Sequence, residues 1–154
     1  MKPIITFLAW LICIQLFACN KNNKPTSSSK NISDTSSMKM KITIGSNTFN
    51  ATVLNNATAI AFKAKLPFTL NMKELNGNEK FFDLSDNLPA NASNPGTIQA
   101  GDLMLYGDNT LVLFYKTFST PYNYTRLARI DDPSGLAAAL GSGNITVILE
   151  INEN

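Results

Sequence analysis

Residues 39–53 read KMKITIGSNTFNATV, and this stretch decides the fold class of the chain. Apolar and polar residues alternate in it on both sides of a Gly-Ser-Asn sequence at positions 45–47. A period of two places alternate side chains on one face of a β-strand, and Gly, Ser and Asn are typical turn residues. The alternating apolar positions are Met40, Ile42, Ile44, Phe49, Ala51 and Val53. The stretch therefore predicts a β-hairpin with one apolar face.

Strand patterns of the same kind recur along the rest of the chain. They cover six further ranges, which are Phe68–Lys73, Lys80–Leu84, Asp102–Tyr106, Thr110–Thr117, Tyr124–Ile130 and Ile145–Ile151. Turn-forming residues separate several of them, as in Asn76-Gly77 and Asn94-Pro95-Gly96. This number of short strands in one domain favours a closed or nearly closed β-barrel, because closure removes exposed sheet edges.

Two segments depart from this alternation and are predicted to be helical. Ala57–Leu66 is rich in alanine and ends before Pro67, which disfavours helical geometry at the residue preceding it. The second segment starts with Asp132 as the N-cap and Pro133 in the first helical position, and it ends before Gly141. We therefore expect a mainly β domain, a small closed β-barrel capped by two short helices.

Five short segments resemble a known family. They are Ala57–Phe62, Leu66–Leu70, Glu79–Phe82, Gly101–Tyr106 and Leu111–Tyr115. Together they resemble the small bacterial cyclophilin-like domain family, and the resemblance spans residues 40–151. It implies a cyclophilin-like barrel closed by two helices. Members of this family occur alone, as tethered lipoproteins and fused to flavodoxin-like domains.

The resemblance does not extend to a catalytic site. True cyclophilins are peptidyl-prolyl isomerases, and their groove holds an arginine beside a histidine, a tryptophan, a glutamine and phenylalanines. This chain has no histidine, its only tryptophan is Trp10, and its only arginines are Arg126 and Arg129. Fold alone does not confer function. We therefore expect a non-catalytic protein, with a divergent peptidyl-prolyl cis-trans isomerase as the alternative.

The start of the chain has the features of a bacterial lipoprotein leader. Lys2 supplies a positive charge, residues 4–17 are almost entirely apolar, and Leu16-Phe17-Ala18-Cys19 resembles a lipobox. We expect a signal peptide over residues 1–18 and lipidation of Cys19, although Phe17 is larger than the residue usually found there. An uncleaved membrane anchor is the alternative, since about 17 apolar residues can span a bilayer.

Residues 20–37 consist mainly of Asn, Lys, Ser and Thr, a composition that cannot bury enough apolar surface to fold. We therefore expect a lipidated cysteine and flexible tether over residues 19–37 and one folded domain over residues 38–154. The lipid bilayer, reached through acylated Cys19, is an expected partner. Asn20 is not the aspartate that retains many lipoproteins at the inner membrane, which favours anchoring to an outer membrane where the cell has one.

Charge and composition exclude several functional classes. The domain has nine Lys and Arg residues against ten Asp and Glu residues, so a nucleic-acid partner is not expected. Both cysteines, Cys13 and Cys19, precede the domain and histidine is absent, which excludes Ser-His and Cys-His nucleophilic sites and the usual zinc sites from the domain. We expect no cofactor, no metal and no catalytic residue. The pair Asp131-Asp132 is assigned to the start of the second helix.

Aromatic residues and an arginine form the candidate ligand site. The candidate ligand-contacting residues are Tyr115, Tyr122, Tyr124 and Arg126, because aromatic walls with a few polar groups are typical of binding pockets. In the alternative interpretation, the tyrosines cover a barrel rim with their hydroxyls in water. Arg126 shares a strand face with Tyr124, whereas Arg129 falls on the other face unless a β-bulge intervenes.

The expected function is a membrane-tethered binding module for a small molecule or an extended peptide. A further alternative is an accessory subunit that docks another envelope protein. The sequence predicts neither the identity of the ligand nor the oligomeric state.

Overall fold

The computed structural model describes residues 38–152. Strands β1 (Lys39–Ile44) and β2 (Asn47–Val53) form the hairpin that the sequence predicts. Its apolar positions point into the core, where Met40, Ile42, Ile44 and Ala51 are fully buried. The predicted signal peptide, Cys19 and the predicted tether lie outside the described residues.

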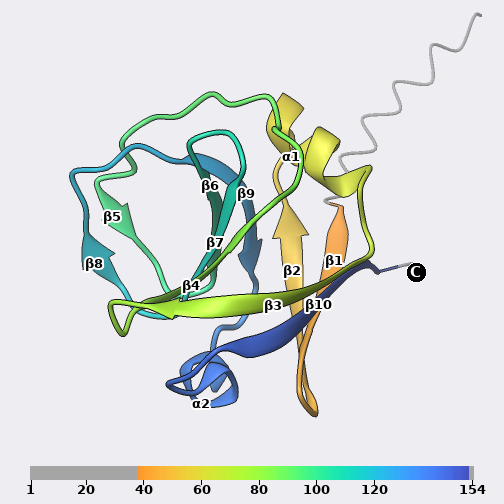
Figure 1. The fold of residues 1–154 in the computed structure, drawn as a ribbon, viewed down its shortest axis with the longest axis vertical. Helices are drawn as coiled ribbons and strands as arrows, with labels where there is room; N and C mark the ends of the chain where they lie inside the picture. Colours follow the sequence, from red (N-terminus) through yellow and green to blue (C-terminus); the bar gives the residue numbers. More distant parts are fainter. Residues whose placement is uncertain (1–37, 153–154) are drawn as a thin grey trace, which may run out of the picture. The chain divides into compact units, whose positions relative to one another are not determined.

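Eight antiparallel strands close into a barrel in the order β1-β10-β3-β4-β7-β6-β9-β2 (Figure 1). The six strands that complete it are β3 (Phe68–Leu75), β4 (Glu79–Asp83), β6 (Asp102–Tyr106), β7 (Thr110–Phe114), β9 (Thr125–Ile130) and β10 (Ile145–Ile151). Every strand of the barrel has a hydrogen-bonded neighbour on both sides, so the barrel has no free edge. The mainly β fold and the closed barrel are confirmed.

Two short helices pack against the barrel on opposite sides in Figure 1. Helix α1 (Ala57–Lys63) begins at an N-cap, Asn56, whose side chain accepts a hydrogen bond from the Ala59 N–H at 2.8 Å. Helix α2 (Leu136–Leu140) starts later than predicted. None of the helices in the part described is long and apolar enough to cross a membrane.

The prediction of Asp132 as the N-cap of the second helix is wrong. The Asp132 carboxylate accepts a hydrogen bond from the Ser134 N–H at 3.0 Å and so closes a turn ahead of the helix. Gly135 occupies the cap position instead, at a φ of 79°, and no side chain caps the helix. Glycine tolerates this left-handed conformation without a steric penalty, which explains why the helix begins after it.

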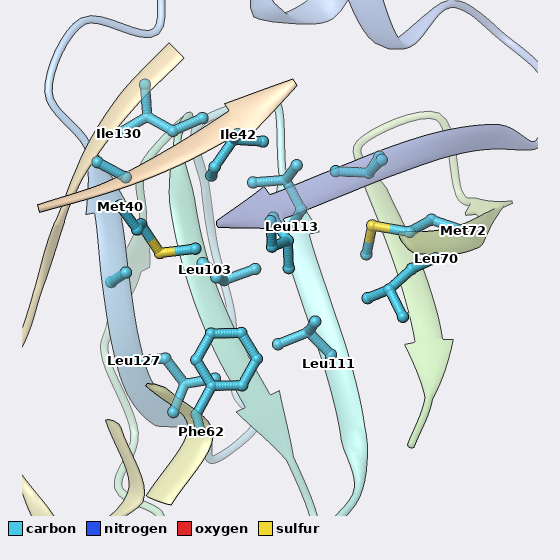
Figure 2. Close-up of a cluster of buried hydrophobic side chains, with 14 of the residues drawn as sticks. Met40, Ile42, Phe62, Leu70, Met72, Leu103, Leu111, Leu113, Leu127 and Ile130 are labelled. Atoms are coloured by element: carbon cyan, nitrogen blue, oxygen red, sulfur yellow. The ribbon is translucent and has the colours of Figure 1, made fainter. Parts of the chain in front are cut away.

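The main hydrophobic core fills the inside of the barrel. Phe62 projects into it from α1, against leucines of β6, β7 and β9 (Figure 2). Leu136 and Leu140 of α2 belong to the same core. The two helices therefore cover the barrel and contribute apolar side chains to its interior.

A second apolar cluster lies outside this core. It consists of Ile98, Met104, Val112, Phe114 and Tyr124, with Phe81 and Phe118 packed against it. Strands β6 and β7 are apolar on both faces for this reason. A separate two-stranded sheet, β5 (Thr97–Ile98) and β8 (Phe118–Ser119), contributes to the cluster through Ile98 and Phe118. Neither of its strands was predicted, since each is only two residues long.

Candidate functional site

A pocket of about 540 Å³ opens beside the second apolar cluster. Its walls come from strands β4 and β7, from the turn between β3 and β4, and from residues 118–124. This volume lies within the range of about 300–1,000 Å³ that small-molecule sites occupy. We call it the aromatic pocket.

Three tyrosines and two phenylalanines give the aromatic pocket its character. The ring of Tyr106 lies 6.3 Å from that of Tyr122, edge to face, and 5.5 Å from that of Tyr124. Tyr124 in turn packs edge to face on Phe114 at 5.4 Å, which ties it to the barrel wall. Edge-to-face contacts of this kind are favourable for aromatic rings. Tyr106 and Tyr122 remain 48% and 58% exposed, so both are available to a ligand.

Two polar residues, Asn78 and Glu79, also line the pocket. Glu79 is the first residue of β4, and its side chain is buried. Burial raises the pKa of its carboxyl, and the negative charge of Glu74 raises it further. The neighbouring Asn78 places its side-chain Oδ1 in a buried position, where it has no hydrogen-bond partner among the described residues. Buried polar atoms are normally paired, so the unpaired Asn78 Oδ1 is an exception, and it belongs to a residue that lines the pocket.

The turn between β3 and β4 places these two residues. Asn76 and Gly77 both adopt positive φ angles, 55° and 65°, as expected for an Asn-Gly turn. The Gly77 N–H donates to the Glu74 carboxylate at 2.9 Å, and Tyr115 N–H donates to the Asn78 backbone carbonyl at 3.0 Å. These bonds hold the backbone of Asn78 in place and so set the direction of its side chain.

The structure brings together two of the four predicted ligand-contacting residues. Tyr122 and Tyr124 both line the aromatic pocket. Tyr115 lies in the main core instead, where its hydroxyl donates to Glu74 at 2.7 Å. Arg126 lines a second pocket, together with Arg129.

Most residues that line the aromatic pocket were not predicted as ligand-contacting, and Asn78, Glu79 and Tyr106 are among them. Asn76-Gly77 was recognised as a turn, and this was the available signal that the next residues begin a strand. A glutamate at a strand start gives no sign of burial in the sequence. Its burial depends on side chains that are distant along the chain.

The model of the cyclophilin-like family matches residues 42–150. The chain belongs to the cyclophilin-like family. The match covers nearly the whole described barrel, from β1 to β10. No curated protein and no solved structure matches the chain.

The aromatic pocket of this cyclophilin-like domain is lined by aromatic rings and a few polar side chains. Neither arginine of the chain lines the aromatic pocket, so the pocket lacks the pairing of a guanidinium with apolar walls that isomerase grooves of true cyclophilins contain. Residues 38–152 also contain no group of three or more side chains placed to ligate a metal ion. Aromatic walls with a few polar groups are typical of small-molecule sites.

Proposed function

We propose that this protein is a lipid-anchored, exported binding module whose cyclophilin-like domain holds an extended peptide or a small molecule in the aromatic pocket. One observation carries the proposal. The pocket combines an exposed aromatic wall with the buried side chain of Glu79 and with Asn78, whose buried Oδ1 has no donor among the described residues. Such a pocket fits a ligand that has an apolar group at one end and N–H donors at the other.

A peptide meets both requirements. Its backbone amides supply donors in a regular series, and an apolar side chain can pack against Tyr106 and Tyr122, which are half exposed in the free protein. A hydrogen bond to a charged acceptor contributes about 1.5–3 kcal/mol, so the amide contact to Glu79 is expected to matter as much as the aromatic packing. The proposed binding role assigns no catalytic function to any group in the pocket.

Binding can be tested with the full chain purified in detergent. The probes are blocked tripeptides, acetyl-Ala-Xaa-Ala-amide, with Ala, Leu, Phe or Pro at the central position, and saturation-transfer NMR reports binding. We expect the Leu, Phe and Pro peptides to bind more tightly than the Ala peptide, because the aromatic wall favours apolar surface. Tyr122→Ala should weaken all three, since Tyr122 supplies exposed ring surface without belonging to either core cluster.

The control for this experiment is a substitution at an exposed residue outside both pockets. Lys116→Gln changes an exposed side chain that lines neither pocket and should leave binding unchanged. Equal binding of the Ala and Phe peptides, or binding insensitive to Tyr122→Ala and Glu79→Gln, would refute a role for the aromatic pocket.

The same proline peptide tests the isomerase alternative. Exchange between its cis and trans forms can be followed by NMR with and without the protein. Uncatalysed exchange takes tens to hundreds of seconds, so acceleration is easily seen. We expect none. Acceleration that disappears in Arg126→Ala would replace the non-catalytic role with an isomerase.

The proposed lipid anchor rests on Leu16-Phe17-Ala18-Cys19 at the end of an apolar leader. Cells fed a labelled fatty acid should label the wild-type protein and leave Cys19→Ala unlabelled. Fractionation should place the labelled protein in the membrane, and in the outer membrane where the cell has one. Equal labelling of both proteins would rule out acylation at Cys19.

A further inference from the structure

Arg126 and Arg129 lie on the same exposed face of β9, although they are three residues apart. In a regular strand, residues at this spacing point to opposite faces. The register of β6 against β9 slips by one residue between Leu103 and Met104, and Leu127 is the extra residue. A β-bulge of this kind turns a side chain to the other face of the sheet. It accounts for the two arginines standing side by side.

Both guanidinium groups converge on the carboxylate of Asp102, the first residue of β6. Arg126 Nη1 lies 4.0 Å from Asp102 Oδ2, and Arg129 Nε lies 3.8 Å from Asp102 Oδ1. Both separations exceed hydrogen-bond distance, so the carboxylate attracts the arginines without occupying their N–H groups. Asp102 Oδ2 accepts its hydrogen bond from the Gln99 N–H at 2.9 Å instead. Buried Asp102 thus attracts two arginine side chains that remain 42% and 53% exposed.

The charge around the two arginines does not balance. Asp131 lines the same pocket, but its two carboxylate oxygens accept hydrogen bonds from Lys39 at 2.8 Å and Thr52 at 2.6 Å. Its charge is therefore compensated by Lys39. Arg126 and Arg129 then share a single carboxylate, that of Asp102, and one positive charge remains for a ligand.

These arginines form one wall of a pocket of about 410 Å³. The pocket shares no lining residue with the aromatic pocket. Its remaining wall is largely apolar and includes Val53, Leu54 and Met104. A site with a cationic wall and an apolar wall fits a molecule that has an anionic head and a short apolar chain.

We propose that this second pocket binds a carboxylate, held by the paired guanidiniums of Arg126 and Arg129, with its apolar chain against Val53, Leu54 and Met104. Guanidinium presents parallel N–H donors that match the two oxygens of a carboxylate. The carboxylate has two possible sources, a small organic acid or the C-terminus of a peptide. The proposal does not depend on the aromatic pocket.

The experiment uses the full chain with ¹⁵N-labelled arginine, whose Nε–Hε signals report directly on the two side chains. Hexanoate represents a small acid and acetyl-Leu-Leu a peptide C-terminus, and hexanamide and acetyl-Leu-Leu-amide are their neutral counterparts. At least one acid should shift both arginine signals, and its amide should bind about ten-fold more weakly or not at all. The stronger of the two acids identifies the source.

Variants separate binding from a structural role. Arg126→Gln and Arg129→Gln should each lower the affinity for the acid about ten-fold. Arg126→Lys should lower it less, because lysine keeps the positive charge but lacks the paired N–H donors of guanidinium. Tyr122→Ala and Lys116→Gln should leave acid binding unchanged. If neither acid shifts the arginine signals, or acid and amide bind equally, the proposal fails. It also fails if the Gln variants lower only the unfolding temperature, since the arginines would then merely neutralise Asp102.

Discussion

Lys80 donates a hydrogen bond to Glu74, its direct cross-strand partner on β3, from a side chain that is completely buried. Its ammonium also donates to the backbone carbonyls of Gly141 at 2.9 Å and Gly143 at 2.6 Å. All three ammonium N–H groups are therefore used. The Tyr115 hydroxyl completes the cluster by donating to Glu74. The cluster fastens the loop between α2 and β10 to the barrel wall.

Replacing Lys80 with Met should lower the free energy of unfolding by about 3 kcal/mol, because a partly buried carboxylate partner and two carbonyls lose their donor. Urea denaturation of wild type and variant measures the difference. Lys116→Met, an exposed site, should change stability by less than about 0.5 kcal/mol. Replacing Glu74 with Gln in the same variant should restore part of the loss. A variant as stable as wild type would mean that the cost of burying the ammonium cancels its bonds.

Glu79→Gln should stabilise the protein at neutral pH. Burial, and then the charge of Glu74, raise the pKa of the Glu79 carboxyl above its usual value of 4.5. A raised folded-state pKa means that the stabilising protonated form is fully present below the unfolded-state pKa and lost as pH rises through the folded value. Glutamine resembles the protonated form at every pH.

Denaturation across pH tests this expectation. Wild type and Glu79→Gln should have equal stability in acid and diverge in favour of the variant as pH rises above 4.5. Glu150→Gln, at a carboxylate that is 40% exposed and paired with Lys41, should show no gain at neutral pH. A constant difference between wild type and Glu79→Gln at all pH values would contradict the assigned titration.

Two tyrosines should ionise late in a spectrophotometric titration. Burial, followed by the hydrogen bond to Glu74, raises the pKa of Tyr115 to about 12. Burial, followed by the charge of Glu79, raises the pKa of Tyr124 to about 12. Tyr115→Phe and Tyr124→Phe should each remove one late-ionising group from the absorbance curve. A late component that keeps its full amplitude in either variant would show that the replaced tyrosine is not one of the late-ionising groups.

The barrel could be predicted because the alternation of apolar and polar residues that marks each strand involves residues adjacent in the sequence. In the β1–β2 hairpin, the alternating residues of the sequence are those that point into the core. Strands β5 and β8 have no such signal, since they are two residues long and depend on contacts with the second apolar cluster. The start of α2 was misplaced because Asp132 satisfies the pattern of an N-cap while its side chain closes a turn.

The candidate sites were predictable only in part, for a related reason. Tyr122 and Tyr124 lie close together in sequence, so their proximity in the pocket follows from the chain itself. The pairing of Arg126 with Arg129 depends on a register slip between two strands, which the sequence of one strand does not specify. The only sign of this slip within β9 is that the adjacent residues Leu127 and Ala128 are both buried, whereas strict alternation would expose one of them.

Gly101 connects barrel stability to the arginine pair, and Gly101→Ala should impair both. Its φ is 90°, and an added Cβ would lie 3.1 Å from the Ile130 Cβ and 3.3 Å from the Pro133 Cβ. Backbone strain costs about 1–2 kcal/mol and crowding adds about 1–3 kcal/mol, so urea denaturation should show a loss of about 3 kcal/mol. Gly107→Ala, at a φ of 61° with open space around it, isolates the backbone part and should lose only about 1 kcal/mol. Because Gly101 directly precedes Asp102, the Arg Nε–Hε signals should also shift in Gly101→Ala and stay in place in Gly107→Ala. Equal losses in the two variants would show that the contacts with Ile130 and Pro133 relax without cost.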